Sequence, residues 1–484
     1  MQKNIFFHLK SLARGWFMGL FLTSSTVLFM QKNIFFHLKS LARGWFMGLF
    51  LTSATVLCAG DYSIAELKLD HADGLYAAGE TVVCTGQLRK DDAPVSEGSL
   101  RCVIKWEGQV VETRDIRNDG TPFRVDYTSP KAGWVYFGFM ALDAQGKLIE
   151  NAPVRVVQNK KHQVGEIGAM YDMDTLRSPM ECPEDFDDFW RAKREMLWSL
   201  PLEAKCERLA DPEEGIELYA VEVPLPGEVR PATGYLAMKS GAVAKSLPLY
   251  MEFLSWMNSD ASRAFAVGAA KKGALAIAAT WHGFPVGKSQ EFYTTEGKSF
   301  NYMTGMEDRD KWVFQATFFR VLRMLAYAKS LPQWNQRDLI VQGGSLGGAQ
   351  SACAAALDPD VTLAIMTVPA FGELNPGRSH RKCPTVMSRV PEMTPEILKT
   401  LSYYDTVNFM ARIQCECYVA TGFVDELVPP STVVAGYHAI PAGTRKTLFL
   451  NPRTGHYGTT VNVPANRRIQ EFFQEKAPWN RPEL

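Results

Sequence analysis

A serine flanked by glycines, between a strand pattern and a helix pattern, constrains this chain more than any other feature. Leu339–Val341 reads as a buried strand, residues 342–348 spell Gln-Gly-Gly-Ser-Leu-Gly-Gly, and an alanine-rich run follows at Ala349–Leu357. Glycines two residues before and after Ser345 permit a sharp turn that lifts the hydroxyl above a parallel sheet. The pattern predicts a nucleophilic serine, with the backbone N–H of Leu346 facing a developing oxyanion. A glycine-rich turn without chemistry is the alternative.

A nucleophilic serine needs a histidine as base, and in such folds the chain order is serine, acid, histidine. His438 and His456 lie late enough in the sequence. His438 falls within a helical pattern at Val433–Ile440, which favours a surface or packing role. His456 lies in a glycine-bracketed loop after the apolar run Thr447–Leu450, where an imidazole is displayed. The sequence favours His456, and activity is expected to fall at acid pH as its ring takes up a proton.

The acid must lie between this serine and this histidine. The candidates are Asp358, Asp360, Asp405, Asp425 and Glu426. Asp425 follows an apolar strand pattern that ends at Gly422, and a carboxylate just past a strand end points into the same crevice as the serine turn. We therefore predict a triad of Ser345, Asp425 and His456. Glu426 is the fallback acid.

A second oxyanion donor is expected from the loop after an earlier strand. The apolar run Tyr250–Leu254 is that strand, and Ser255 and Trp256 follow it. We predict the backbone N–H of Trp256 as the donor. The alternative is that Trp256 is only a pocket wall or a core residue.

Apolar runs of strand length alternate with helical patterns from about residue 200 onward. Strand patterns occur at Leu249–Leu254, Ala274–Thr280 and Tyr418–Phe423, and Phe314–Leu331 has helical periodicity. This alternation predicts a mainly parallel sheet with helices on both faces over residues 201–484. With the serine turn described above, the pattern is typical of the α/β hydrolase fold. Residues 158–200 are expected to be a linker and a leading helix.

Residues 61–157 have the strict alternation of β-strands. Leu100, Cys102 and Ile104 alternate with polar or exposed positions, and about seven short strands are expected. The pattern predicts a small immunoglobulin-like β-sandwich. Such a domain is most often a spacer or a lid, and glycan binding through Trp106 or Trp134 is the alternative.

Residues 1–60 look like a secretion signal present twice. Residues 1–29 and 30–58 are nearly identical, and each carries basic residues before a short apolar stretch, with small residues at Ala59 and Gly60. We expect cleavage near residue 60 and export to the periplasm or the extracellular space. The apolar stretch is too short for a stable membrane span. A lipid anchor at Cys58 is less favoured, and a start at Met1 or Met30 is left open.

Charge and cysteine usage narrow the function further. Lys plus Arg equals Asp plus Glu, 52 against 52, so no basic field favours nucleic acid. The eight histidines form no pair at metal-ligand spacing, so we expect no metal and no cofactor. Export would permit disulfides. The pairing Cys84–Cys102 and buried free thiols are both retained as expectations.

Several segments together resemble the acetyl xylan esterase/cephalosporin C deacetylase family of α/β hydrolases, over roughly residues 180–480. The matching segments are Pro183–Trp190, Gly343–Gly348, Thr400–Phe409, Gly422–Asp425, Pro429–Thr432 and Gly455–His456. Two of them, Thr400–Phe409 and Pro429–Thr432, are the most specific, because a generic hydrolase has no need of them. The resemblance implies a serine esterase that forms an acetyl-enzyme and releases acetate from acetylated polysaccharide or oligosaccharide.

The sequence also departs from the family pattern. Leu346 stands where the family usually has glutamine, and Leu254–Trp256 replaces a His-Gly-Tyr-like turn. Backbone donors tolerate both changes, whereas the substrate range stays open. Acetylated xylan, xylo-oligosaccharides or related sugars are the expected substrates. The alternatives are a feruloyl or glucuronoyl esterase, a small peptidase, or a non-catalytic glycan-binding protein; a homo-oligomer is left open.

Overall fold

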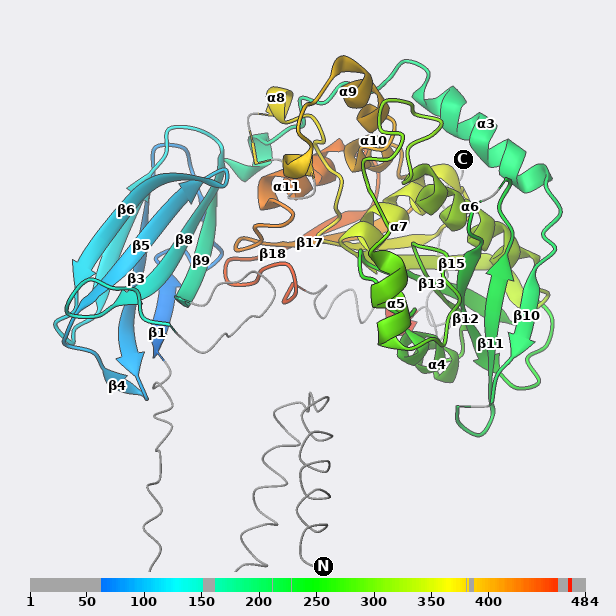
Figure 1. Cartoon of the computed structure of the whole chain (residues 1–484), viewed down its shortest axis with the longest axis horizontal. Coiled ribbons are helices and arrows are strands. Elements are labelled where there is room, and N and C mark those ends of the chain that lie inside the picture. The colour runs from blue at the N-terminus through cyan, green and yellow to red at the C-terminus, as the bar shows by residue number, and fades with distance from the viewer. Residues whose placement is uncertain are drawn as a thin grey trace, which may run out of the picture. The chain divides into compact units, whose positions relative to one another are not determined.

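A computed structural model describes residues 62–150, 162–210, 212–227, 229–379, 381–382, 387–459 and 469–471 (Figure 1). The expected secretion signal at residues 1–60 lies outside these residues. Within the described part of the chain, no helix is both long and apolar enough to cross a membrane.

The first part of the described chain is a β-sandwich of two packed sheets. The four-stranded sheet contains β1 (Tyr62–Leu69), β3 (Thr81–Lys90), β4 (Ala93–Pro94) and β7 (Phe123–Thr128). The five-stranded sheet has the order β2 (Leu75–Tyr76), β9 (Gln163–Tyr171), β8 (Gly133–Leu142), β5 (Ser99–Trp106) and β6 (Gln109–Arg117). The expected β-sandwich is confirmed. The expected boundary at residue 157 is wrong, because β9 pairs along β8 and extends this part to Tyr171.

The cysteines of the sandwich are core residues. Cys84 on β3 and Cys102 on β5 are fully buried, and both thiols are free. Burial raises the pKa of each thiol, so both stay protonated and unreactive at neutral pH. The expected pairing Cys84–Cys102 is therefore wrong, and the alternative of buried thiols is confirmed.

The tryptophans considered for glycan binding are also packed inside the fold. The Trp134 ring is fully buried. Trp106 is half-buried, and its ring packs against Tyr127 and Tyr171. The structure therefore offers no exposed Trp134 surface on which a sugar ring could stack.

The second part is built on a nine-stranded sheet. Its order is β10 (Lys205–Arg208), β11 (Ile216–Val223), β12 (Ala232–Lys239), β14 (Leu275–Ala279), β13 (Leu247–Phe253), β15 (Trp334–Gly344), β16 (Leu363–Thr367), β17 (Glu416–Gly422) and β18 (Lys446–Asn451). The neighbours from β14 to β18 pair in parallel, and the pairs from β10 to β14 are antiparallel. The sheet is mainly parallel, which confirms the predicted α/β hydrolase fold.

Helices cover both faces of this sheet. Leu339 and Val341 of β15 join the larger core, whereas Ile340 points to a second cluster on the other face. The larger core receives residues from α3 (Phe186–Ser199), α6 (Gln315–Ser330), α7 (Leu346–Leu357), α9 (Pro395–Ser402), α10 (Thr406–Met410) and α11 (Pro430–Ala439). The other face is covered by α4 (Arg263–Lys271), which lies across the sheet from α6 in Figure 1.

The remaining helical segments are short. They are η3 (Met173–Thr175), α5 (Gln290–Gly297), α8 (Pro376–Ser379) and η4 (Met387–Arg389). The expected leading helix is α3, which buries Phe186, Phe189, Trp190 and Leu197.

A buried arginine on α6 joins several segments of the larger domain. Arg323 is 1% exposed, and its guanidinium donates hydrogen bonds of 2.7–3.2 Å to four carbonyl oxygens. The acceptors are the carbonyls of Leu197, Leu200, Pro201 and Pro224. Removing the guanidinium would leave these carbonyls without their donor in a dry site.

The substitution Arg323→Met is therefore expected to lower the free energy of unfolding by about 3 kcal/mol. Chemical denaturation of the two proteins measures the difference. Arg191→Met is the matched control, because the Arg191 side chain is 55% exposed on α3 and its loss should change stability by less than about 0.5 kcal/mol. Equal destabilisation by both variants would contradict the role of Arg323.

Candidate active site

Ser345 occupies a strained turn between β15 and α7. Its φ is 55° and its ψ −121°, a conformation that non-glycine residues rarely adopt. The turn is held from both sides, since the Ser345 N–H donates to the Thr367 carbonyl at 2.9 Å and the Ala370 N–H donates to the Ser345 carbonyl at 3.0 Å. The strain is thus fixed by the neighbouring strand β16, as expected for a preorganised nucleophile.

The flanking glycines are needed because backbones approach closely at the turn. A Cβ on Gly343 would lie 2.4 Å from the carbonyl carbon of Gly347. A Cβ on Gly347 would lie 2.2 Å from the carbonyl oxygen of Phe253. Any larger residue at either position would push the turn apart. This steric contact explains why glycines stand two residues before and two residues after Ser345.

Asp425 and His456, which the sequence predicts as the acid and the base, contact each other in the structure. Asp425 lies three residues after β17, and its Oδ2 accepts a hydrogen bond from Nδ1 of His456 at 2.8 Å. A carboxylate only accepts hydrogen bonds, so Nδ1 carries a proton and Nε2 can act as a base. The Asp425 side chain is fully buried, and that of His456 is 8% exposed.

The second carboxylate oxygen of Asp425 is also satisfied. Oδ1 accepts the backbone N–H groups of Leu427 at 2.9 Å and Val428 at 3.0 Å. These bonds fix the orientation of the Asp425 side chain. One carboxylate oxygen of Asp425 therefore bonds to His456, and the other bonds to the backbone of the loop that follows Asp425.

The three predicted residues lie at one edge of the sheet. Strands β15, β16, β17 and β18 are consecutive parallel neighbours, so their carboxyl ends share an edge. Ser345 follows β15, Asp425 follows β17 and His456 follows β18. The two loops after β17 and β18 are joined by the Val424 N–H, which donates to the Thr454 carbonyl at 3.2 Å.

Other candidates read from the sequence have different partners. Nδ1 of His438 lies 2.8 Å from the Leu176 carbonyl oxygen and also contacts Arg177. Asp358 and Asp360 both pair with Lys329. Glu426, the fallback acid, pairs with Lys105 of the β-sandwich.

Asp405 acts as a scaffold for a neighbouring loop. Its carboxylate accepts the backbone N–H groups of Glu373 at 3.2 Å, Leu374 at 2.8 Å and Val407 at 2.9 Å. Burial raises the pKa of Asp405 to about 6. The carboxylate thus caps α10 and fixes the loop after β16, which runs beside the serine turn.

The expected oxyanion donors lie in two segments, Leu346 directly after the serine and Trp256 in the loop after β13. Leu346 is the first residue of α7, so its N–H has no helical carbonyl before it. The Ser255 hydroxyl donates to the Gly344 carbonyl at 2.7 Å, which holds the loop after β13 against the serine turn. Within the described ranges, the Trp256 N–H meets no hydrogen-bond acceptor. Both N–H groups are therefore available to a ligand oxygen.

The Trp256 side chain belongs to an aromatic cluster. Its indole contacts the rings of Trp281, Phe300, Tyr302, Phe314 and Phe371 at centroid distances of 5.1–6.5 Å. The alternative that Trp256 is a core residue therefore describes its side chain, and the donor role of its backbone N–H stays a prediction. Sequence reasoning missed Ser255 and Phe371, because neither stands in a pattern that marks a site.

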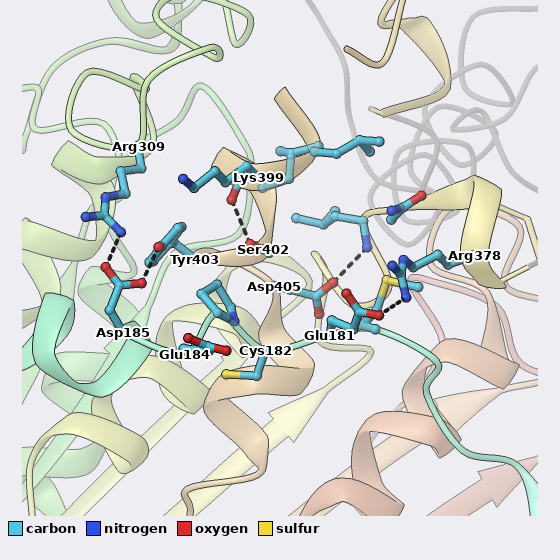
Figure 2. A pocket seen from close by; sticks show the side chains of 16 residues that line it. Glu181, Cys182, Glu184, Asp185, Arg309, Arg378, Lys399, Ser402, Tyr403 and Asp405 are labelled. Carbon is cyan, nitrogen blue, oxygen red and sulfur yellow. Dashed lines mark hydrogen bonds and ion pairs between the residues drawn. The ribbon is translucent and has the colours of Figure 1, made fainter. Parts of the chain in front are cut away.

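A large pocket lies away from the serine turn. It has a volume of about 770 Å³ and is lined by the segment before α3, the loop after β16 and helix α9 (Figure 2). Ser345, Asp425 and His456 are not among its lining residues. Two ion pairs lie in its lining, Arg309 with Asp185 and Arg378 with Glu181. This pocket is therefore distinct from the candidate active site.

The fold and the site define a serine esterase of the α/β hydrolase class. The sequence matches the acetyl xylan esterase (AXE1) family over residues 169–475, which is more than half of the chain. The protein therefore belongs to the acetyl xylan esterase (AXE1) family. The match begins near the end of β9, so most of the β-sandwich lies outside it.

Individual relatives agree with this assignment. The acetyl esterase Axe7A of Xylanibacter ruminicola is 27% identical over 300 residues, covering 60% of this chain and 67% of the relative. The acetyl xylan esterase from Paenibacillus sp. R4 superposes with a TM-score of 0.53 at 22% identity. The acetyl xylan esterase 1 from Thermoanaerobacterium sp. JW/SL YS485 gives 0.53 at 20%. Each alignment covers 63% of this chain and 98% of the solved one, which supports the same fold.

Proposed function

We propose that this carbohydrate esterase removes O-acetyl groups from acetylated xylan, xylo-oligosaccharides or related sugars. The observation that carries the proposal is the 2.8 Å contact between His456 and Asp425 at the sheet edge that also holds the strained Ser345. Membership of the acetyl xylan esterase family supports the acetyl group as the acyl part.

In the proposed mechanism, His456 Nε2 takes the proton of the Ser345 hydroxyl while Oγ attacks the acetyl carbonyl carbon. The N–H groups of Leu346 and Trp256 stabilise the oxyanion. The C–O bond to the sugar then breaks, and the sugar oxygen leaves with the proton from His456. Water attacks the acetyl-enzyme with His456 again as base, releasing acetate. Asp425 holds the imidazole tautomer and stabilises its charge.

The test compares ester classes on the purified protein. We expect acetate release from acetylated xylan and xylo-oligosaccharides with a higher kcat/KM than hydrolysis of feruloyl or glucuronoyl esters or of small peptides. A fluorophosphonate probe is expected to label Ser345, as mapped by peptide mass spectrometry. Absence of labelling and turnover would favour the non-catalytic glycan-binding alternative. Labelling of Ser345 together with a higher kcat/KM for another ester would overturn the acetyl substrate but not the serine esterase mechanism.

We further propose that the protein is exported with removal of residues 1–60. The basic residues, the short apolar stretch and the small residues before Asp61 support this. N-terminal sequencing of the protein secreted by an expressing bacterium is expected to begin near Asp61. A protein that stays inside the cell and still carries residues 1–60 would contradict the proposal.

A further inference from the structure

We propose that the N-terminal β-sandwich is part of the catalytic apparatus, because it holds the loop that carries Asp425 and thereby positions the acid against His456. The inference rests on the proposed function. The β-sandwich and the larger domain belong to one compact unit. Their contacts concentrate on the residues immediately around Asp425.

The first contact is a buried hydrogen bond just before the acid. Trp134 on β8 is fully buried, and its Nε1–H donates to the Phe423 carbonyl at 2.6 Å. Phe423 stands two residues before Asp425 and is itself fully buried. A dry hydrogen bond of this length fixes the carbonyl orientation at the entrance of the acid loop.

The second contact lies just after the acid. Lys105 on β5 pairs with Oε1 of Glu426 at 2.5 Å, and both side chains are mostly shielded from water. Lys382 of the larger domain donates to the Glu426 backbone carbonyl at 2.6 Å. Asp425 is therefore bracketed by a β-sandwich contact on each side.

The third contact reaches the helix that follows the loop. Glu107 is buried, and its Oε2 accepts a hydrogen bond from the Ser431 hydroxyl at 2.7 Å. Its Oε1 accepts a hydrogen bond from the backbone N–H of Trp134 at 2.7 Å. Burial raises the pKa of Glu107. One carboxyl group thus ties the anchoring tryptophan of the sandwich to the start of α11.

The fourth contact reaches the loop of the base. The Gly168 N–H of β9 donates to the Pro452 carbonyl at 2.8 Å, four residues before His456. A Cβ at Gly168 would lie 2.2 Å from the Phe423 carbonyl oxygen, so only glycine allows β9 to approach both loops. The sandwich thereby contacts the acid loop and the base loop through one strand.

These polar contacts surround a shared apolar cluster. Its buried members are Trp134, Tyr136, Met170, Leu176, Phe423, Val424 and Val434. The cluster combines side chains from both parts of the chain, so neither loop can shift without opening packed surface. Since residues 62–168 lie outside the family match, this support is an addition to the family's catalytic domain.

The test removes one hydrogen bond and keeps the ring. Trp134→Phe retains aromatic bulk but cannot donate to Phe423. We expect kcat for acetate release to fall about tenfold with KM changed less than about twofold, since small displacements of a catalytic group cost rate.

The matched control is Trp106→Phe in the same sandwich. Trp106 packs against Tyr127 and Tyr171, and it is not a member of the shared cluster. Its replacement is expected to leave both kcat and KM within about twofold of the parent values. Thermal unfolding of each variant checks that the fold is retained.

A second variant keeps the proposal testable if Trp134→Phe does not fold. Lys105→Met retains the aliphatic stem and removes the charge that pairs with Glu426, and about a threefold loss of kcat is expected. An unchanged kcat in the folded variants would overturn the proposal, as would an effect on KM alone. A parent protein without esterase activity would instead refute the proposed function, so the two failures are distinguishable.

Discussion

Replacement of Ser345 by alanine is expected to lower kcat for acetate release by about four to six orders of magnitude. The alanine variant lacks the oxygen that attacks the acetyl carbon, and no acetyl-enzyme forms. The N–H groups of Leu346 and Trp256 remain, so a weak residual rate over water is expected. Acetate release under saturating substrate measures the loss.

Ser402→Ala is the matched control for this variant. Ser402 ends helix α9, and its exposed hydroxyl donates only to the Lys399 carbonyl, so kcat should stay within about twofold. Loss of fluorophosphonate labelling should accompany the Ser345 variant alone. Equal acetate release by the parent and by Ser345→Ala would show that another residue is the nucleophile.

Replacement of Asp425 by asparagine is expected to lower kcat about ten-thousandfold. The Leu427 and Val428 N–H groups require an acceptor at Oδ1, so the asparagine amide oxygen must stay there. The NH₂ group then faces His456 Nδ1, which must accept rather than donate. The proton moves to Nε2, where the base can no longer take the serine proton.

The rate of Asp425→Asn should be compared with that of Asp360→Asn. Asp360 is another of the carboxylates between Ser345 and His456 in the sequence. It pairs with Lys329, so its replacement should leave kcat nearly unchanged. A loss of less than about tenfold for Asp425→Asn would assign the orienting role to a different acid.

The sequence could predict the parts of the site that local rules determine. Gly343 and Gly347 mark the turn because steric contact forbids a Cβ there. The strand patterns before Ser345, Asp425 and His456 predict one shared sheet edge, because parallel strands align their carboxyl ends. The hydrogen bond between acid and histidine agrees with that prediction.

The features that the sequence could not predict depend on contacts between distant residues. Trp134 and its acceptor Phe423 are 289 positions apart, and no periodicity links them. The positive φ angles of Val368 and Phe371 occur without glycine, so the loop after β16 carries no sequence mark of its shape. Asp405 stands in a family-like segment, yet only its three backbone donors reveal a scaffold rather than a catalytic acid.

The buried cluster around Trp134 and Phe423 also determines the shortest fragment of the chain that is expected to fold by itself. A fragment starting at residue 201 would keep Ser345, Asp425 and His456 but would expose Phe423, Val424 and Val434 to water. Apolar surface uncovered in this way promotes aggregation. The two parts are therefore expected to melt in a single cooperative transition, and a shortened protein should begin no later than the first strand of the sandwich.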